Sequence, residues 1–242
     1  MTDARLDAHR DRLIVALDCA TLDEALALQA KLDGVVSRFK IGLELFTVAG
    51  PRAVEAVRAR GGRVFLDLKI HDIPETARRA AWAAAATGAE LITVHVAGGP
   101  AMLEAAVEGA RHGGGAKILG VTVLTSLDAL ELAHVETAHD SVRELVIKRV
   151  EVARAAGLDG VVASPRELAD VRAALGDEPL VVTPGVRPRS AAEDDQKRVA
   201  TAAEAIAAGA SAVVVGRPIR DAPDPRAAAI ALLEELDAAA IV

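Results

Sequence analysis

Two charged residues lie two positions apart in an otherwise apolar run, Asp67 and Lys69 in RVFLDLKI. On a strand such residues point to one side, and the flanking Leu66, Leu68 and Ile70 then take the other. Burying an unpaired charge is costly, so we expect this carboxylate and this ammonium to be paired or functional. Groups held in this way also titrate abnormally, which is common at sites of acid–base chemistry.

Three more ionisable residues belong to the same pattern. Lys40 lies inside the apolar stretch VSRFKIGLEL, Asp18 ends LIVALD, and Asp72 closes Asp-x-Lys-x-x-Asp. Taken one at a time, each has a structural explanation: a lysine that locks two strands by a salt bridge, an aspartate that caps a strand end, or Asp72 as the N-cap of the helix opened by Pro74. Together, groups of both signs at neighbouring strand ends favour a functional site.

A second cluster combines arginines with glycines near the end of the chain. Arg187 follows a glycine in TPGVRP, the adjoining loop contains Gln196, and Gly216 precedes Arg217 in GRPI. Guanidinium groups bind phosphate through paired hydrogen bonds, and glycines and helix starts let backbone amides approach an anion. The alternative is that both arginines are solvated surface charges. Their place beside glycines favours a phosphate site.

Eight short apolar runs must position these residues, with helix-like segments such as 22–32, 53–61 and 77–88 between them. Near-continuous apolar strands indicate a parallel sheet buried on both faces, and eight units in 242 residues match the (β/α)8 TIM barrel, whose active site lies at the carboxyl ends of the strands. An open doubly wound sheet is the competing fold. The runs are LIVAL from Leu13, VSRFKI from Val36, RVFLDL from Arg63, LITVHV from Leu91, KILGVTVL from Lys117, GVVAS from Gly160, LVVTP from Leu180 and AVVVG from Ala212.

No linker divides the chain, so we expect one domain over 1–242, with 1–12 as a polar N-terminal extension and 126–140 as a polar insertion after the fifth strand. A net charge of -7 argues against binding to nucleic acid or to an acidic membrane surface. No signal-peptide pattern or membrane-spanning apolar run is present, and Cys19 is the single cysteine. These features predict a cytoplasmic protein.

The histidines predict no metal site, because none of the six stands at a metal-ligand spacing from another. His95 is interpreted as a hydrogen-bonded interior residue and His71 as part of a loop. The chain also has no GxSxG motif, P-loop or dinucleotide-binding fingerprint, and nothing near Cys19 indicates an activated thiol.

Five strings resemble the orotidine 5'-phosphate decarboxylase family, in family order and over nearly the whole chain. The Asp-x-Lys-x-x-Asp core is shared with phosphosugar barrels such as 3-hexulose-6-phosphate synthase, but those tend to carry an acidic residue where Lys40 stands, and they use magnesium. The strings are ValAlaLeuAsp at 15–18, PheLysIleGly at 39–42, AspLeuLysIleHisAspIlePro at 67–74, ThrProGlyValArgPro at 183–188 and GlyArgProIle at 216–219.

The resemblance implies cofactor-free decarboxylation of orotidine 5'-monophosphate to uridine 5'-monophosphate. Loss of carbon dioxide leaves a carbanion at C6 that the ring delocalises poorly, so fixed charges must stabilise it. By similarity, Lys69 donates the proton and Asp67 lies near the departing carboxylate. Lys40 holds the network and contacts the ribose, and Asp72 completes the array.

The resemblance also implies a homodimer in which Asp72 and Thr76 reach the partner's site. Asp18 is then expected to bind a ribose hydroxyl, and Thr125 with Ser126 to meet the pyrimidine edge. The residues expected to bind the phosphate are Arg187, Gln196, Gly216 and Arg217. Two alternatives remain: a magnesium-dependent phosphosugar lyase or decarboxylase of the same barrel group, and a catalytically silent barrel that binds a nucleotide or sugar phosphate.

Overall fold

Eight parallel strands close into a barrel in the order in which they occur along the chain. The protein was studied as a computed structural model, which describes residues 9–127, 129–134, 141–187 and 200–239. The closed strand order confirms the predicted TIM barrel and excludes the open doubly wound sheet. The strands are β1 (Leu13–Ala16), β2 (Arg38–Gly42), β3 (Arg63–Ile70), β4 (Leu91–His95), β5 (Lys117–Val121), β6 (Gly160–Val162), β7 (Leu180–Pro184) and β8 (Ala212–Val215).

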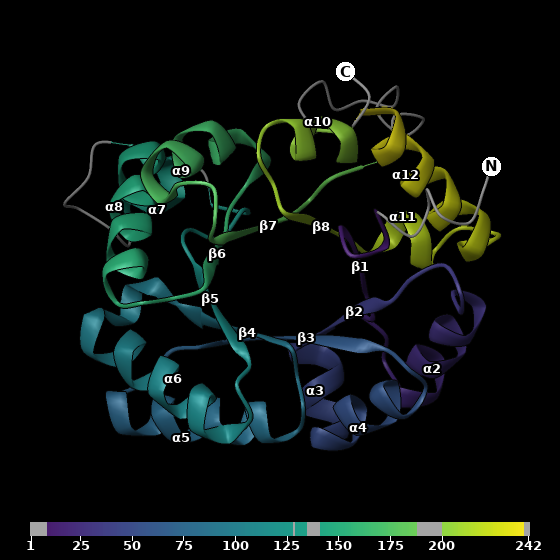
Figure 1. Cartoon of the computed structure of the whole chain (residues 1–242), viewed down its shortest axis with the longest axis horizontal. Helices are drawn as coiled ribbons and strands as arrows, with labels where there is room; N and C mark the ends of the chain where they lie inside the picture. Colours follow the sequence, from purple (N-terminus) through teal and green to yellow (C-terminus); the bar gives the residue numbers. More distant parts are fainter. Residues whose placement is uncertain (1–8, 128, 135–140, 188–199, 240–242) are drawn as a thin grey trace.

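Helices surround this ring of strands (Figure 1). Local signals set several of their starts: the Thr21 and Ser141 hydroxyls accept hydrogen bonds from the backbone N–H three residues on, at 3.2 Å each. Such caps contribute about 1 kcal/mol each. The helices are α2 (Leu22–Lys31), α3 (Leu43–Ala49), α4 (Pro51–Ala59), α5 (Pro74–Ala86), α6 (Pro100–Gly113), α7 (Ala129–Ala133), α8 (Val142–Ala155), α9 (Leu168–Leu175), α10 (Ala202–Ala207), α11 (Arg217–Arg220) and α12 (Pro225–Ala239), with 3-10 turns η1 (Val96–Gly98) and η2 (Pro165–Glu167).

The connection from β2 to β3 differs from its prediction. The sequence predicted one helix there, but α3 precedes α4, and Gly50 separates them with a φ of 60°, which glycine adopts without strain. At the amino terminus, residues 1–8 of the predicted 1–12 extension lie outside the described residues. His9 is buried, and its Nε2 lies 3.5 Å from Oδ1 of Asp237 on α12.

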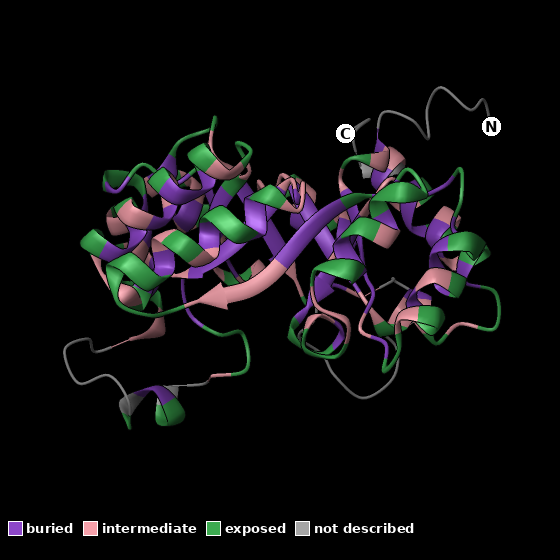
Figure 2. Cartoon of the chain, turned by 90° about the horizontal axis from the view of Figure 1, so that it is seen from below, coloured by how far each residue is buried: buried purple, intermediate pink, exposed green. Residues whose placement is uncertain are grey.

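The apolar core has two parts, as expected for strands covered on both faces. A large cluster fills the space between strands and helices, and a smaller one fills the barrel interior, where Phe65, Leu91 and Leu119 meet. Burying such side chains contributes about 1.5–3 kcal/mol each. β3 is buried over its first half and becomes half-buried from Asp67 to Ile70, as Figure 2 shows for the long strand. The interior therefore opens toward the carboxyl ends of the strands.

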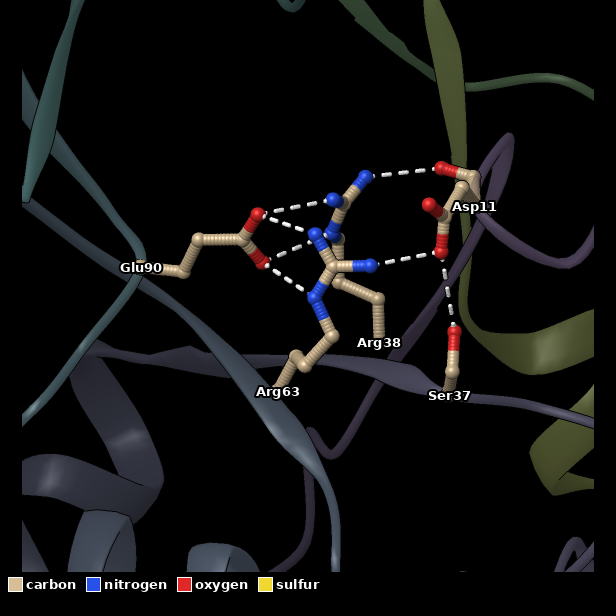
Figure 3. A network of polar contacts seen from close by, with 5 residues as sticks. All are labelled: Asp11, Ser37, Arg38, Arg63 and Glu90. Carbon is tan, nitrogen blue, oxygen red and sulfur yellow. Dashed lines mark hydrogen bonds and ion pairs between the residues drawn. The ribbon is translucent and has the colours of Figure 1, made fainter.

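Charged residues occupy the opposite mouth of the barrel and form the amino-end network of Asp11, Ser37, Arg38, Arg63 and Glu90 (Figure 3). Both Glu90 oxygens accept hydrogen bonds from Arg38, at 2.9 and 3.1 Å, and both also accept from Arg63. Arg63 Nη1 also reaches Asp11 Oδ1 at 2.6 Å. Burial by itself raises the pKa of Glu90, but the two guanidinium groups outweigh it and hold that pKa below 4.5.

Candidate active site

Four charged residues at the carboxyl ends of β1, β2 and β3 form a continuous chain of alternating sign. Lys40 Nζ lies 2.9 Å from Asp18 Oδ1 and 3.8 Å from Asp67 Oδ2, and Lys69 Nζ lies 2.8 Å from the same Asp67 oxygen. The side chains of Lys40 and Asp67 are only 13% and 14% exposed. The structure thus brings together four of the predicted residues, and in this low-exposure setting each charge depends on its neighbours.

Strand β3 departs from regular geometry where it carries this chemistry. Phe65 and Leu66 pair with the first two residues of β4, but the next pairing joins Ile70 to Val94, so the register shifts between them. Lys69 has a φ of 50°, the one positive φ of a non-glycine residue in the described ranges. The prediction of a regular strand is therefore wrong at Lys69, although its ammonium meets Asp67 as expected. Strain of this kind persists only when surrounding contacts hold it.

Thr93 on β4 supplies those contacts. Its hydroxyl accepts a hydrogen bond from the Lys69 backbone N–H at 2.8 Å and donates one to Asp67 Oδ1 at 2.9 Å. The sequence analysis missed Thr93, although it shares the face of β4 with Leu91, which lies in the barrel interior. We call Asp18, Lys40, Asp67, Lys69 and Thr93 the carboxyl-end network.

Gly42 is a second residue that sequence reasoning missed, although it ends the PheLysIleGly string. A Cβ at this position would lie 2.9 Å from Lys40 Nζ and 3.1 Å from Asp18 Oδ1. The pair is held at van der Waals contact with the glycine, so a side chain there would push it apart. The absence of a side chain at Gly42 therefore shapes the ion pair.

Asp72 and Thr76 stand apart from this chain of contacts. Both are exposed, and Asp72 Oδ1 accepts a hydrogen bond from the backbone N–H of Ile73 at 2.7 Å. Helix α5 begins at Pro74 as predicted, but its N-cap is Ile73 rather than Asp72. Within the described residues, Asp72 makes no ion pair with Lys40 or Lys69.

A cavity of about 690 Å³ begins at Asp18 and Lys40 and extends along the ends of β7 and β8. Arg187, Gly216 and Arg217 line it, as predicted for the phosphate end. The Arg187 backbone N–H donates to Ala200 O at 3.3 Å, which joins the two described ends of this loop. Gln196 lies outside the described residues, within 188–199. The other lining residues are Ala16, Pro184, Gly185, Val186, Val214, Pro218, Arg220 and Asp221.

Two predictions about this end need correction. Helix α11 has only four residues, Arg217–Arg220, so it contributes little of the helix-dipole attraction expected for an anion. The predicted pyrimidine residues, Thr125 and Ser126, are exposed in a turn after β5, and Thr125 lines a neighbouring cavity of about 620 Å³. The two cavities share Pro184 and Gly185. Of the 126–140 insertion, residues 128 and 135–140 lie outside the described residues.

His95 follows Thr93 on β4 and stacks against His71, with ring centroids 5.3 Å apart. Burial lowers the pKa of His95 to about 4, and the charges of Arg149, His71 and Lys69 add to this effect. Its buried Nδ1 has no hydrogen-bond partner among the described residues, which contradicts the interpretation of His95 as a hydrogen-bonded interior residue. In the described ranges, His, Cys, Asp and Glu side chains form no group of three or more that could hold a metal ion.

Comparison with known proteins identifies the family. The model of the Orotidine 5'-phosphate decarboxylase / HUMPS family matches residues 11–232. An orotidine 5'-phosphate decarboxylase of Anaeromyxobacter sp. (strain K) is 53% identical over 222 residues, covering 92% of this chain and 96% of that protein. The corresponding protein of Moorella thermoacetica is 49% identical over 234 residues, covering 94% of this chain and 93% of that one.

A solved structure agrees with these relatives. The orotidine 5'-phosphate decarboxylase of Lactobacillus acidophilus superposes with a TM-score of 0.82 at 36% identity, covering 93% of this chain and 99% of that one. Among the helices that the structure describes, none is both long and apolar enough to span a bilayer. The sequence match over most of the chain and the shared barrel confirm the predicted resemblance: the chain belongs to the orotidine 5'-phosphate decarboxylase / HUMPS family.

Proposed function

We propose that the chain decarboxylates orotidine 5'-monophosphate to uridine 5'-monophosphate without a cofactor. The observation that carries this proposal is the unbroken series Asp18, Lys40, Asp67, Lys69 at the mouth of the barrel, with successive opposite charges 2.8 to 3.8 Å apart. The named relatives support the choice of substrate. Fixed charges of this kind can stabilise a developing carbanion without reorganising during the reaction.

The chemistry requires one bond to break and one proton to move. The bond between C6 and the carboxylate carbon breaks, carbon dioxide leaves, and the electron pair remains on C6. Lys69 then donates a proton from its ammonium to C6, and the resulting amine takes up a proton from solvent. Asp67 lies beside the departing carboxylate and favours its loss, and Lys40 keeps Asp67 in place while contacting the ribose. This division is supported by Asp67, which accepts from Lys69 and Thr93 through different oxygens.

The far end of the cavity binds the phosphate in this proposal. Arg187 and Arg217 supply guanidinium groups, Gly216 leaves room for the ligand, and Gln196 adds a hydrogen bond from the 188–199 loop. Asp18 binds a ribose hydroxyl, and Thr125 with Ser126 contacts the pyrimidine. The phosphate is remote from C6, yet its binding energy can hold the charged network in its reactive arrangement.

The site is completed by a second copy of the chain, with Asp72 and Thr76 reaching the partner's cavity. The exposure of both residues supports this, as does Ile73, which is 67% exposed on the same connection. Mixing Lys69→Ala and Asp72→Ala proteins tests it, because a mixed dimer has one site with both residues intact. Random exchange should restore about a quarter of wild-type activity. Activity that stays at the level of the separate variants would refute shared sites.

A location in the cytoplasm completes the proposal, and it is supported by Cys19, a free and buried thiol. Fractionation of the source cells tests it by locating the chain in the cytoplasmic or the membrane fraction.

The decisive experiment mixes the purified protein with orotidine 5'-monophosphate in buffer that contains a chelator and follows the pyrimidine absorbance. Turnover under these conditions would exclude both the magnesium-dependent phosphosugar enzyme and the silent binding barrel. Activity that requires added magnesium would favour the first of these alternatives. Binding without turnover would favour the second.

A further inference from the structure

Arg220 joins two parts of the cavity that lie far apart in the sequence. From the end of α11, its Nη1 donates a hydrogen bond of 2.6 Å to the backbone carbonyl of Asp18, beyond the end of β1. Its Nε and Nη2 bind the two carboxylate oxygens of Asp221 at 2.7 and 3.1 Å. A single side chain therefore connects the segment that carries Arg217 to the segment that carries Asp18.

The guanidinium group of Arg220 is held in a fixed orientation. Its paired contact with Asp221 uses one edge of the planar fork, and this aims the remaining nitrogen at the Asp18 carbonyl. The Asp221 contact also raises the pKa of Arg220, so the group stays charged. Ile219, which is fully buried, anchors α11 between Arg217 and Arg220. The two arginines are therefore carried by one anchored turn, and both line the same cavity.

Beyond Asp18 the contacts continue directly to the reacting end. Asp18 binds Lys40, Lys40 lies near Asp67, and Asp67 binds Lys69. We propose that Arg220 is a positioning residue that transmits occupancy of the phosphate end to the Asp18–Lys40 pair. This inference rests on the proposed function, because it assigns the two ends of the cavity to the phosphate and to the reacting ring. Arg220 touches neither the phosphate nor C6 in this role.

The test compares substrates with and without the phosphate. kcat/KM is measured for orotidine 5'-monophosphate and for orotidine, and affinity is measured by titration with uridine 5'-monophosphate and with uridine. For Arg220→Ala we expect kcat/KM for the phosphorylated substrate to fall at least about 10-fold and that for orotidine less than about 3-fold. A purely structural role would lower both by the same factor.

Two further variants and one control sharpen the result. Arg220→Lys keeps the charge but cannot bind Asp18 and Asp221 at once, so it should rescue less than half of the lost kcat/KM. Asp221→Asn keeps Arg220 and loosens its orientation, so it should give a smaller effect. The matched control is Arg226→Ala on α12, since Arg226 also donates to a distant backbone carbonyl, that of Asp33, away from the cavity. It should leave the ratio of the two kcat/KM values unchanged.

The outcomes separate this inference from the proposed function. Equal losses for both substrates in Arg220→Ala, or no loss for either, would overturn the positioning role while wild-type turnover still supports the function. A wild-type protein without turnover would overturn the function, and the titrations would then decide the coupling. They support it if Arg220→Ala weakens uridine 5'-monophosphate selectively, and they overturn it if both ligands weaken equally or the nucleotide does not bind. If orotidine turnover is too slow to measure, the same titrations decide.

Discussion

The two ends of the barrel carry charged networks built on the same strands but from different side chains. β2 contributes Arg38 to the amino-end network and Lys40 to the carboxyl-end network, and β3 contributes Arg63 and Lys69 in the same way. At the amino end, both oxygens of Glu90 are bound by two guanidinium forks. At the carboxyl end, ammonium groups make single contacts with Asp18 and Asp67.

This difference in residue type separates fixing a structure from moving a proton. A guanidinium binds a carboxylate in a planar, paired geometry and stays protonated at any physiological pH. Contacts with Glu90 and Asp11 outweigh the effect of burial and raise the pKa of Arg63 further. An ammonium is a compact charge on a flexible stem, and it can release its proton. Arginines therefore suit the end that holds the strands together, and lysines suit the end proposed to react.

The largest expected effect tests the reacting end. Lys69→Ala should lower kcat by more than the 10²- to 10³-fold typical of one lost oxyanion donor, because charge stabilisation and the proton are lost together. Initial rates with orotidine 5'-monophosphate measure it, and urea unfolding should show that the variant remains folded. Near-normal turnover would contradict the assigned role and remove the contrast between the two ends.

A matched pair of arginine variants should separate the ends by type of effect. Arg217→Ala should raise KM about 10- to 100-fold with little change in stability, because its guanidinium is exposed at the cavity. Arg63→Ala should leave KM within about 2-fold and lower the free energy of unfolding by about 1–2 kcal/mol. Steady-state kinetics and urea unfolding on both proteins measure these quantities. A loss of affinity in Arg63→Ala would show that the ends are coupled.

The smallest expected effect is the pH dependence of stability that arises at the amino end. The pKa of Glu90 is held below 4.5, so the unfolded chain binds more protons than the folded one as the pH falls through this region. The stabilisation from Glu90 is therefore present above about pH 4.5 and is lost below it. In Glu90→Gln the free energy of unfolding should vary less between about pH 5 and pH 3. An unchanged slope in urea unfolding would show that the network contributes nothing.

Much of the fold could be predicted because its signals are local. Each apolar run from Leu13 to Ala212 marks a strand within a few residues, and Pro74 marks the start of α5. The break at Gly50 that gives the separate helix α3 was not predicted, because a glycine and a proline within a helical pattern do not show whether the chain ends one helix or continues it. Strand ends also shifted, since each strand ends where pairing with its neighbour stops.

The candidate site was predicted in part, for the same reason. Asp67 and Lys69 stand out because they are charges in an apolar run. Thr93 and Arg220 lack such contrast, since a threonine is ordinary in a strand and an arginine is ordinary after one. Their roles depend on contacts 24 and 202 residues away in the sequence.

The order of residues alone determined the barrel, the location of the charges and the family to which the chain belongs, because periodic apolar runs and short motifs are written within single segments. Tertiary structure decided the rest: the left-handed backbone of Lys69, the glycine contact that shapes the Lys40–Asp18 pair, and the closure of the opposite mouth by Arg38, Arg63 and Glu90. Each of these depends on groups from different strands meeting at a few ångströms, and only closure of the barrel sets those distances.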